Sequence, residues 1–108
     1  MALTLKTLDA RELPTTSALI YTVPANTTTR LTELWISNNA NAVRTFTLWI
    51  LNPGGSEGDD NQLINVMNLP QNVPIILPLN SYLDTADFVR IIASGADCAV
   101  RLSGIEEA

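Results

Sequence analysis

The sequence predicts an all-β protein: an antiparallel β-sandwich of about eight strands with a jelly-roll-like arrangement. Segments rich in Thr, Val, Ile and aromatic residues are cut about every ten residues by Pro, Gly and Asn clusters, which is typical of antiparallel sandwiches. Within these segments apolar and polar residues alternate, as half-buried strands require. The length of 108 residues predicts one domain, and an apolar content of 46% argues against disorder.

Residues 1–14 are expected to form an N-terminal arm that precedes a single β-sandwich domain of residues 15–108. Leu3, Leu5 and Leu8 are spaced partly as in a strand, so the arm is predicted to pair with another strand, either in its own chain or in a neighbour. The first strand of the sandwich is expected at Ala18–Val23. It is followed by a turn in which Asn26 tolerates the left-handed backbone conformation that Gly normally takes.

The next two strands are predicted at Thr28–Asn38 and Val43–Leu51, joined by a polar loop. Leu34 and Ile36 share one face of the first strand, and Phe46, Leu48 and Ile50 share one face of the second. A hairpin symmetric about Ala42 pairs these core residues and places Trp35 opposite Trp49 on the outer face.

The second half of the chain begins with the longest loop, Asn52–Asn61, whose composition predicts an exposed segment. Pro74 and Pro78 mark the strand Val73–Leu79 as an edge strand or as a segment with strand ends. The remaining elements are a strand at Leu63–Met67, a turn region with at most one helical turn at Asn80–Asp87, a hairpin of Phe88–Ala93 with Cys98–Ser103, and a short acidic tail at Gly104–Ala108.

The charge and composition argue against several classes of function. With 6 basic and 11 acidic residues the net charge is −5, which argues against nucleic-acid binding. No apolar run is long enough to span a bilayer, and the N-terminus does not resemble a secretory signal, so we expect a soluble protein made in a cytoplasm. A charged fraction of 16%, below the usual level of roughly 25%, suits a surface that packs against neighbours.

The sequence gives little support for a catalytic function. There is no histidine and Cys98 is the only cysteine, so Ser–His and Cys–His systems are excluded. Asp84 and Asp87 are interpreted as turn residues rather than as a carboxylate pair. Glu57, Asp59 and Asp60 are compatible with a calcium site, but a solvated acidic loop is the simpler interpretation. We therefore predict no enzyme, no catalytic residue, no metal and no cofactor.

Trp35 and Trp49 are the most informative side chains, because two outward tryptophans need an explanation. Another layer of the same chain, an intermolecular contact and a sugar-stacking platform are all compatible with the pattern. Arg90 and Arg101 are also predicted to face outward, opposite each other in the last hairpin. A solvated face, pairing with Glu33 and an acidic partner on a neighbouring chain remain open for them.

The stretch Leu19–Thr28, LIYTVPANTT, resembles a recurring opening of small structural proteins of tailed-bacteriophage virions. The resemblance extends over about residues 14–106 and includes Leu31–Asn39, Thr45–Ile50, Ile76–Asn80 and Phe88–Ser94. The chain departs from the pattern at Asn26, where Gly is usual, and in its two outward tryptophans. The motifs describe a sandwich and carry over no residue-level site.

The resemblance implies a non-enzymatic virion protein, most of all a capsid decoration or cement protein that binds the outside of the head and stabilises it. It implies a homo-oligomer, with a trimer expected, and partners such as the major capsid protein. The protein is then expected in the virion after synthesis in the host bacterial cytoplasm. A tail- or fibre-associated subunit and a carbohydrate-binding module that uses both tryptophans are the alternatives. The candidate interface residues are Leu3, Leu5, Trp35, Trp49, Arg90 and Arg101.

Overall fold

The computed structural model describes residues 3–12, 15–55 and 62–108, and these residues form eight β-strands. No helix that could span a membrane is found in this part of the chain. The strands are β1 (Leu3–Glu12), β2 (Ala18–Thr22), β3 (Thr28–Asn38), β4 (Arg44–Leu51), β5 (Gln62–Leu69), β6 (Ile75–Leu83), β7 (Phe88–Ala93) and β8 (Cys98–Glu107).

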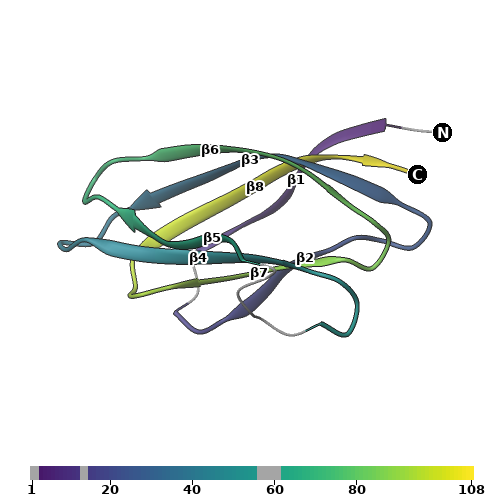
Figure 1. Ribbon diagram of the computed structural model, residues 1–108. Helices are drawn as coiled ribbons and strands as arrows, with labels where there is room; N and C mark the ends of the chain where they lie inside the picture. Colours follow the sequence, from purple (N-terminus) through teal and green to yellow (C-terminus); the bar gives the residue numbers. More distant parts are fainter. Residues whose placement is uncertain (1–2, 13–14, 56–61) are drawn as a thin grey trace.

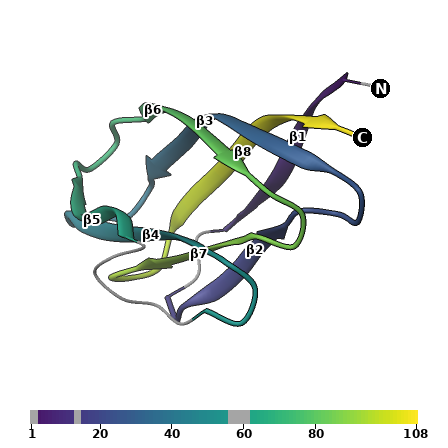
Figure 2. The same cartoon turned by 45° about the vertical axis from the view of Figure 1, so that its right-hand side comes forward.

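The strands form two four-stranded sheets that face each other, as both ribbon views show (Figures 1 and 2). The first sheet has the order β1-β8-β3-β6 and the second has the order β2-β7-β4-β5. Every pairing is antiparallel. This order is that of a jelly roll, in which every connection except β4–β5 crosses from one sheet to the other. The predicted fold class is therefore confirmed.

The core lies between the sheets and is built from the inward positions of the alternating strands. Leu34 and Ile36 of β3 are almost fully buried, as are Phe46 and Leu48 of β4, so the sequence assigned these four side chains to the correct face. Ile50 is only partly buried and packs against the edge of the cluster.

The two hairpins predicted from the sequence are wrong. β3 belongs to the first sheet and β4 to the second, so the loop between them carries the chain across the sandwich instead of turning it back. The same is true of β7 and β8. Alternation of apolar residues tells which face of a strand is buried but does not tell which strand lies beside it.

β6 and β8 extend further than predicted. β6 continues through Pro78 and Asn80 to Leu83, because it is an edge strand and a register shift in its pairing with β3 accommodates the irregular backbone. The predicted turn is therefore confined to the residues after Leu83. β8 runs to Glu107, so the segment expected to be an acidic tail is part of a strand.

The N-terminal segment forms an edge strand of the sandwich in this structure. β1 pairs with β8 from Leu3↔Glu107 to Glu12↔Ala99, with one irregularity between Thr7 and Asp9. Asn26 has a φ of 56°, which confirms the left-handed conformation expected there. The predicted ion-binding residues Glu57, Asp59 and Asp60 lie outside the described residues.

Candidate interaction surface

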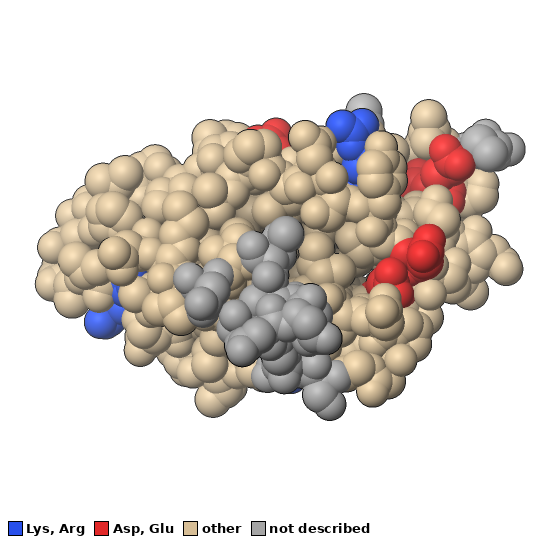
Figure 3. Space-filling view, viewed as in Figure 1, with Lys and Arg blue, Asp and Glu red and all other residues tan. Residues whose placement is uncertain are grey.

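The outer face of the first sheet carries several large apolar side chains. Leu3, Trp35, Ile76 and Tyr82 are all exposed. Trp35 lies on β3 and Ile76 and Tyr82 on β6, and the opposite faces of these two strands contribute Leu34, Leu83 and other buried residues to the core. Figure 3 views the sandwich from the side, as Figure 1 does, and most of the surface drawn there outside the grey residues is neither acidic nor basic. The outer face of the first sheet is the strongest candidate for a contact with another molecule.

Trp35 lies at one end of this face. Its register partners are Arg101 on β8 and Ile76 on β6, so the three residues form a row across the sheet. The indole Nε1 of Trp35 donates a hydrogen bond to Glu33 Oε2 at 3.1 Å. A hollow of about 180 Å³ opens beside the indole, with Pro74 and Arg101 among its lining residues. Trp35 is 45% exposed, so apolar surface of this residue remains available for a contact.

Tyr82 lies toward the other end of the face and is 80% exposed. It pairs in register with Arg30, whose guanidinium carbon is 6.0 Å from the centre of the tyrosine ring. Arg30 also donates a hydrogen bond to Asn80 Oδ1 at 2.9 Å. A second hollow, of about 240 Å³, lies here and includes Leu3 and Ile105 in its lining.

Trp49 does not join this surface. It is half-buried on β4 in the second sheet, where its register partner on β7 is Arg90. Arg90 donates hydrogen bonds to the Ser17 hydroxyl at 3.1 Å and to the Ser17 carbonyl at 3.0 Å. The predicted Trp35–Trp49 pair is therefore wrong, because the two tryptophans belong to different sheets.

The prediction that Arg90 and Arg101 lie opposite each other in one hairpin is also wrong, because Arg90 belongs to the second sheet and Arg101 to the first. Among the described residues no ion pair joins Arg101 to Glu33. Leu3 lies at the exposed start of β1, whereas the side chain of Leu5 is outside the described part of the structure.

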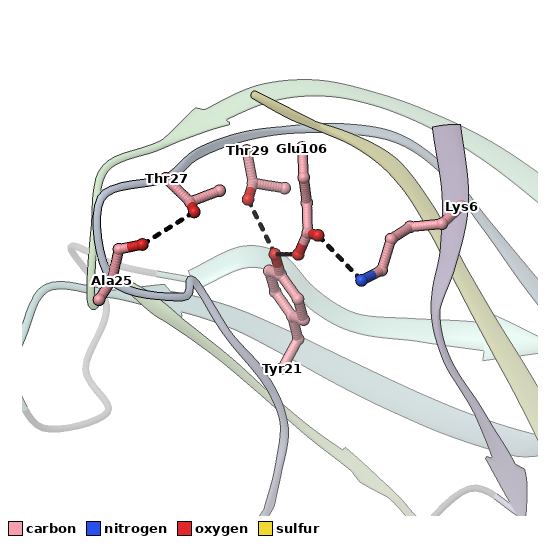
Figure 4. A network of polar contacts seen from close by, with 6 residues as sticks. All are labelled: Lys6, Tyr21, Ala25, Thr27, Thr29 and Glu106. Atoms are coloured by element: carbon pink, nitrogen blue, oxygen red, sulfur yellow. Dashed lines mark hydrogen bonds and ion pairs between the residues drawn. The ribbon is translucent and has the colours of Figure 1, made fainter. Parts of the chain in front are cut away.

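A polar cluster that the sequence did not predict joins the two sheets near the end of β8. We call it the Glu106 cluster; its members are Lys6, Tyr21, Thr29 and Glu106 (Figure 4). Glu106 accepts a hydrogen bond from the Tyr21 hydroxyl at 2.5 Å and pairs with Lys6 Nζ at 2.9 Å. The Tyr21 hydroxyl also lies 2.8 Å from Thr29 Oγ1. The cluster connects β1 to β8, β3 and β2.

Burial and the neighbouring carboxylate shift the acidities in the Glu106 cluster. Burial raises the pKa of Tyr21 to about 12, with the hydrogen bond to Glu106 as the second cause. The hydrogen bonds from Tyr21 and Lys6 lower the pKa of Glu106 below its ordinary value. Glu106 is therefore ionised at neutral pH and holds Lys6 by charge as well as by hydrogen bonding.

The groups with catalytic potential have structural partners. Asp87 closes the turn after β6, because its Oδ2 accepts a hydrogen bond from the Asp84 amide at 2.9 Å. Cys98 is buried, and burial raises the pKa of its thiol. Within residues 3–12, 15–55 and 62–108, no three Cys, Asp or Glu side chains come together as metal ligands would.

Comparison with known proteins adds a likeness in fold. No protein-family model and no curated protein matches the sequence. A chain of the T13 viral particle of infectious bursal disease virus is similar in structure, with a TM-score of 0.59 and 11% identity over 97% of this chain. A chain of the Gx strain of that virus gives a TM-score of 0.51, also at 11% identity over 97% of this chain.

The present chain spans 30% and 31% of the lengths of those two viral chains. At this identity the likeness concerns the fold alone. The jelly roll described above is thus a fold that chains of a viral particle also contain.

Proposed function

We propose that this protein is a non-enzymatic structural subunit of a bacteriophage virion, which binds the outside of the head and stabilises it as a decoration or cement protein. The observation that carries the proposal is the outer face of the first sheet, where Trp35, Ile76 and Tyr82 are exposed on a jelly roll. Chains of a viral particle share the fold, and the stretch Leu19–Thr28 resembles an opening of small virion proteins.

Attachment through this face follows from its composition. Aromatic and arginine side chains provide most of the binding energy at many protein interfaces, and Trp35 and Arg101 lie together beside a hollow. Truncating such a residue costs about 2 kcal/mol or more of binding free energy when it is fully covered. Many copies on one particle add their contributions through avidity, so weak single contacts suffice.

The partners in this proposal are the major capsid protein and further copies of the chain, with a trimer as the expected assembly. The low charge fraction of 16% supports extensive contact between subunits. Light scattering measures the assembly directly. A monomer at high protein concentration would contradict self-association in solution.

A reloading experiment tests the attachment. Purified particles stripped of the subunit are incubated with wild-type protein, with Trp35→Ala or with Val43→Ala, and the retained copies are counted after sedimentation. Val43 is exposed on the connection before β4, away from the proposed face, so it is the matched control. Trp35→Ala is expected to reduce retention at least tenfold at limiting protein. Equal retention of all three proteins would refute attachment through this face.

Electron microscopy of the reloaded particle tests the location. Density over the head is expected. Density confined to the tail or fibres would replace the decoration role by a tail- or fibre-associated role, and binding to glycans without binding to particles would favour a carbohydrate-binding module centred on Trp35.

A further inference from the structure

We propose that β1 is an exchangeable strand, which leaves its own sheet and pairs with β8 of a second copy of this chain. The proposal deepens the proposed homo-oligomer, on which it rests. Its first basis is that the buried hydrophobic cluster takes no residue from β1. None of the described β1 side chains is buried, and only Leu8 packs partly against the cluster. Among the described residues, the buried cluster is therefore built by the other strands.

The second basis is a docking position on β8 for Leu8. Gly104 has no side chain, and a Cβ atom there would lie 2.8 Å from Leu8 Cδ1 and 2.7 Å from the Arg30 carbonyl oxygen. Real Cβ atoms do not approach other atoms so closely, so glycine leaves the space that Leu8 occupies. The edge of β8 thus recognises an apolar side chain at one defined register.

The third basis is the Glu106 cluster, which recognises Lys6. Glu106 is ionised and is oriented by Tyr21, whose hydroxyl also contacts Thr29, and all three residues belong to the sandwich outside β1. Lys6 is the member that β1 supplies, and its ion pair at 2.9 Å fixes the strand at the register Lys6↔Gly104. Arg11 Nε donates a hydrogen bond to Asp9 Oδ2 at 2.6 Å within β1, so this interaction is kept when the strand pairs with another copy.

A β1 strand from another copy finds on β8 the same backbone hydrogen-bonding groups, the same Gly104 and the same Glu106 carboxylate as the chain's own β1. The contacts are equal in the two arrangements, so the balance depends on concentration. A short connection, here residues 13–17, gives the tethered strand an effective concentration in the millimolar range. Exchange therefore competes with intrachain pairing when the subunits themselves reach about 1 mM.

Disulfide trapping between two different full-length chains tests the exchange. Thr7 and Ser103 are register partners, and directly opposed residues of antiparallel strands are close enough for a disulfide. One chain carries Thr7→Cys and the other carries Ser103→Cys, so a bond between positions 7 and 103 forms only when β1 of one chain lies on β8 of the other. The chains are mixed at about 1 mM and at about 10 µM, oxidised, and mapped by mass spectrometry.

The expected result is a mixed dimer at the higher concentration, linked at positions 7 and 103. A chain with Thr15→Cys, mixed with the Ser103→Cys chain, reports random collision, because Thr15 is exposed outside β1. Adding Lys6→Glu to the Thr7→Cys chain places like charges at the Glu106 cluster whichever copy its β1 pairs with. The yield is therefore expected to equal that with Thr4→Ala, an exposed change on the same strand, and a lower yield with Lys6→Glu alone would contradict equal contacts in the two arrangements.

A yield no higher than that of the Thr15→Cys control at about 1 mM overturns the proposal. Light scattering on the same samples separates this failure from failure of the proposed oligomer. Oligomers without the 7–103 bond mean that the copies associate through another surface, whereas the absence of oligomers and of the bond removes both proposals.

Discussion

Asn38 is expected to contribute more to stability than any other single polar side chain described. It is the last residue of β3 and its side chain is fully buried. Its Nδ2 donates hydrogen bonds to the carbonyl oxygens of Ala42 and Leu69 at 2.8 and 2.9 Å. Its Oδ1 accepts a hydrogen bond from the Ala40 amide at 2.9 Å. One side chain therefore joins the end of β3 to the following connection and to the end of β5.

The substitution Asn38→Ala leaves these three backbone groups without their partner. Leu69 and Ala40 are buried, so water does not readily replace the bond, and each unsatisfied group costs about 1–3 kcal/mol. Ala42 is exposed, so its carbonyl regains a partner in water. The expected loss is about 3 kcal/mol of unfolding free energy, with a small further contribution from the cavity.

Urea unfolding followed by tryptophan fluorescence measures this loss, and Asn39→Ala provides the control because the Asn39 side chain is exposed. The control is expected to change stability by no more than about 0.5 kcal/mol. Asn38→Asp, which turns a carboxylate oxygen toward two carbonyls, is expected to be at least as destabilising as Asn38→Ala at neutral pH. A loss below about 1 kcal/mol for Asn38→Ala would refute the reasoning, because it would mean that the buried groups find other partners.

Four further predictions concern hydrogen bonding, ionisation and backbone strain. Tyr21→Phe removes the hydroxyl that bonds Glu106 and is expected to cost about 1–2 kcal/mol in urea unfolding; an unchanged midpoint would contradict this. Because the folded pKa of Tyr21 is raised from 10.0 to about 12, its proton stabilises the fold below pH 10.0, and that stability is lost as the pH rises toward 12, which an absorbance titration of the phenolate detects. Glu106 behaves in the opposite sense: its lowered pKa stabilises the fold above its ordinary value of 4.5, and the effect disappears as the pH falls through the folded pKa. Lys6→Met is expected to weaken this acid dependence in unfolding measured over a pH series, and parallel curves for the two proteins would argue against it. Val66 has a φ of 45°, which is strained for a β-branched residue, so Val66→Gly is expected to gain about 0.5–1 kcal/mol, and any loss would show that the strain is absent.

The sequence predicted the strands and their buried faces well, because both depend on local alternation. β3 and β7 have the predicted bounds, Thr28–Asn38 and Phe88–Ala93. The neighbours of each strand were predicted less well. A short loop can close a hairpin within one sheet or carry the chain to the other sheet, and the local sequence does not distinguish the two. The pairing of Trp35 with Trp49 depended on that choice and failed with it.

The outer face was predicted only in part. Trp35 and Arg101 were recognised as outward-facing from their parity, but Tyr82 was missed because Asn80–Asp87 was interpreted as a turn. The Glu106 cluster brings together residues from the two ends of the chain and from β2 and β3. No local pattern marks such a contact, since Lys6 and Glu106 are neighbours only through the β1–β8 ladder.

The antiparallel arrangement of β1 and β8 has a mechanical consequence. Leu3 lies beside Glu107, so the start of one strand and the end of the other are at the same end of the molecule (Figure 1). Their ladder hydrogen bonds run across the strands, so a force that separates these two ends acts along the bonds and opens them one pair after another. Such unzipping needs little force and leaves the core intact at first. A force that slides one sheet past the other must instead disturb the whole packed interior at once, so the resistance of this subunit to tension depends on the direction of loading.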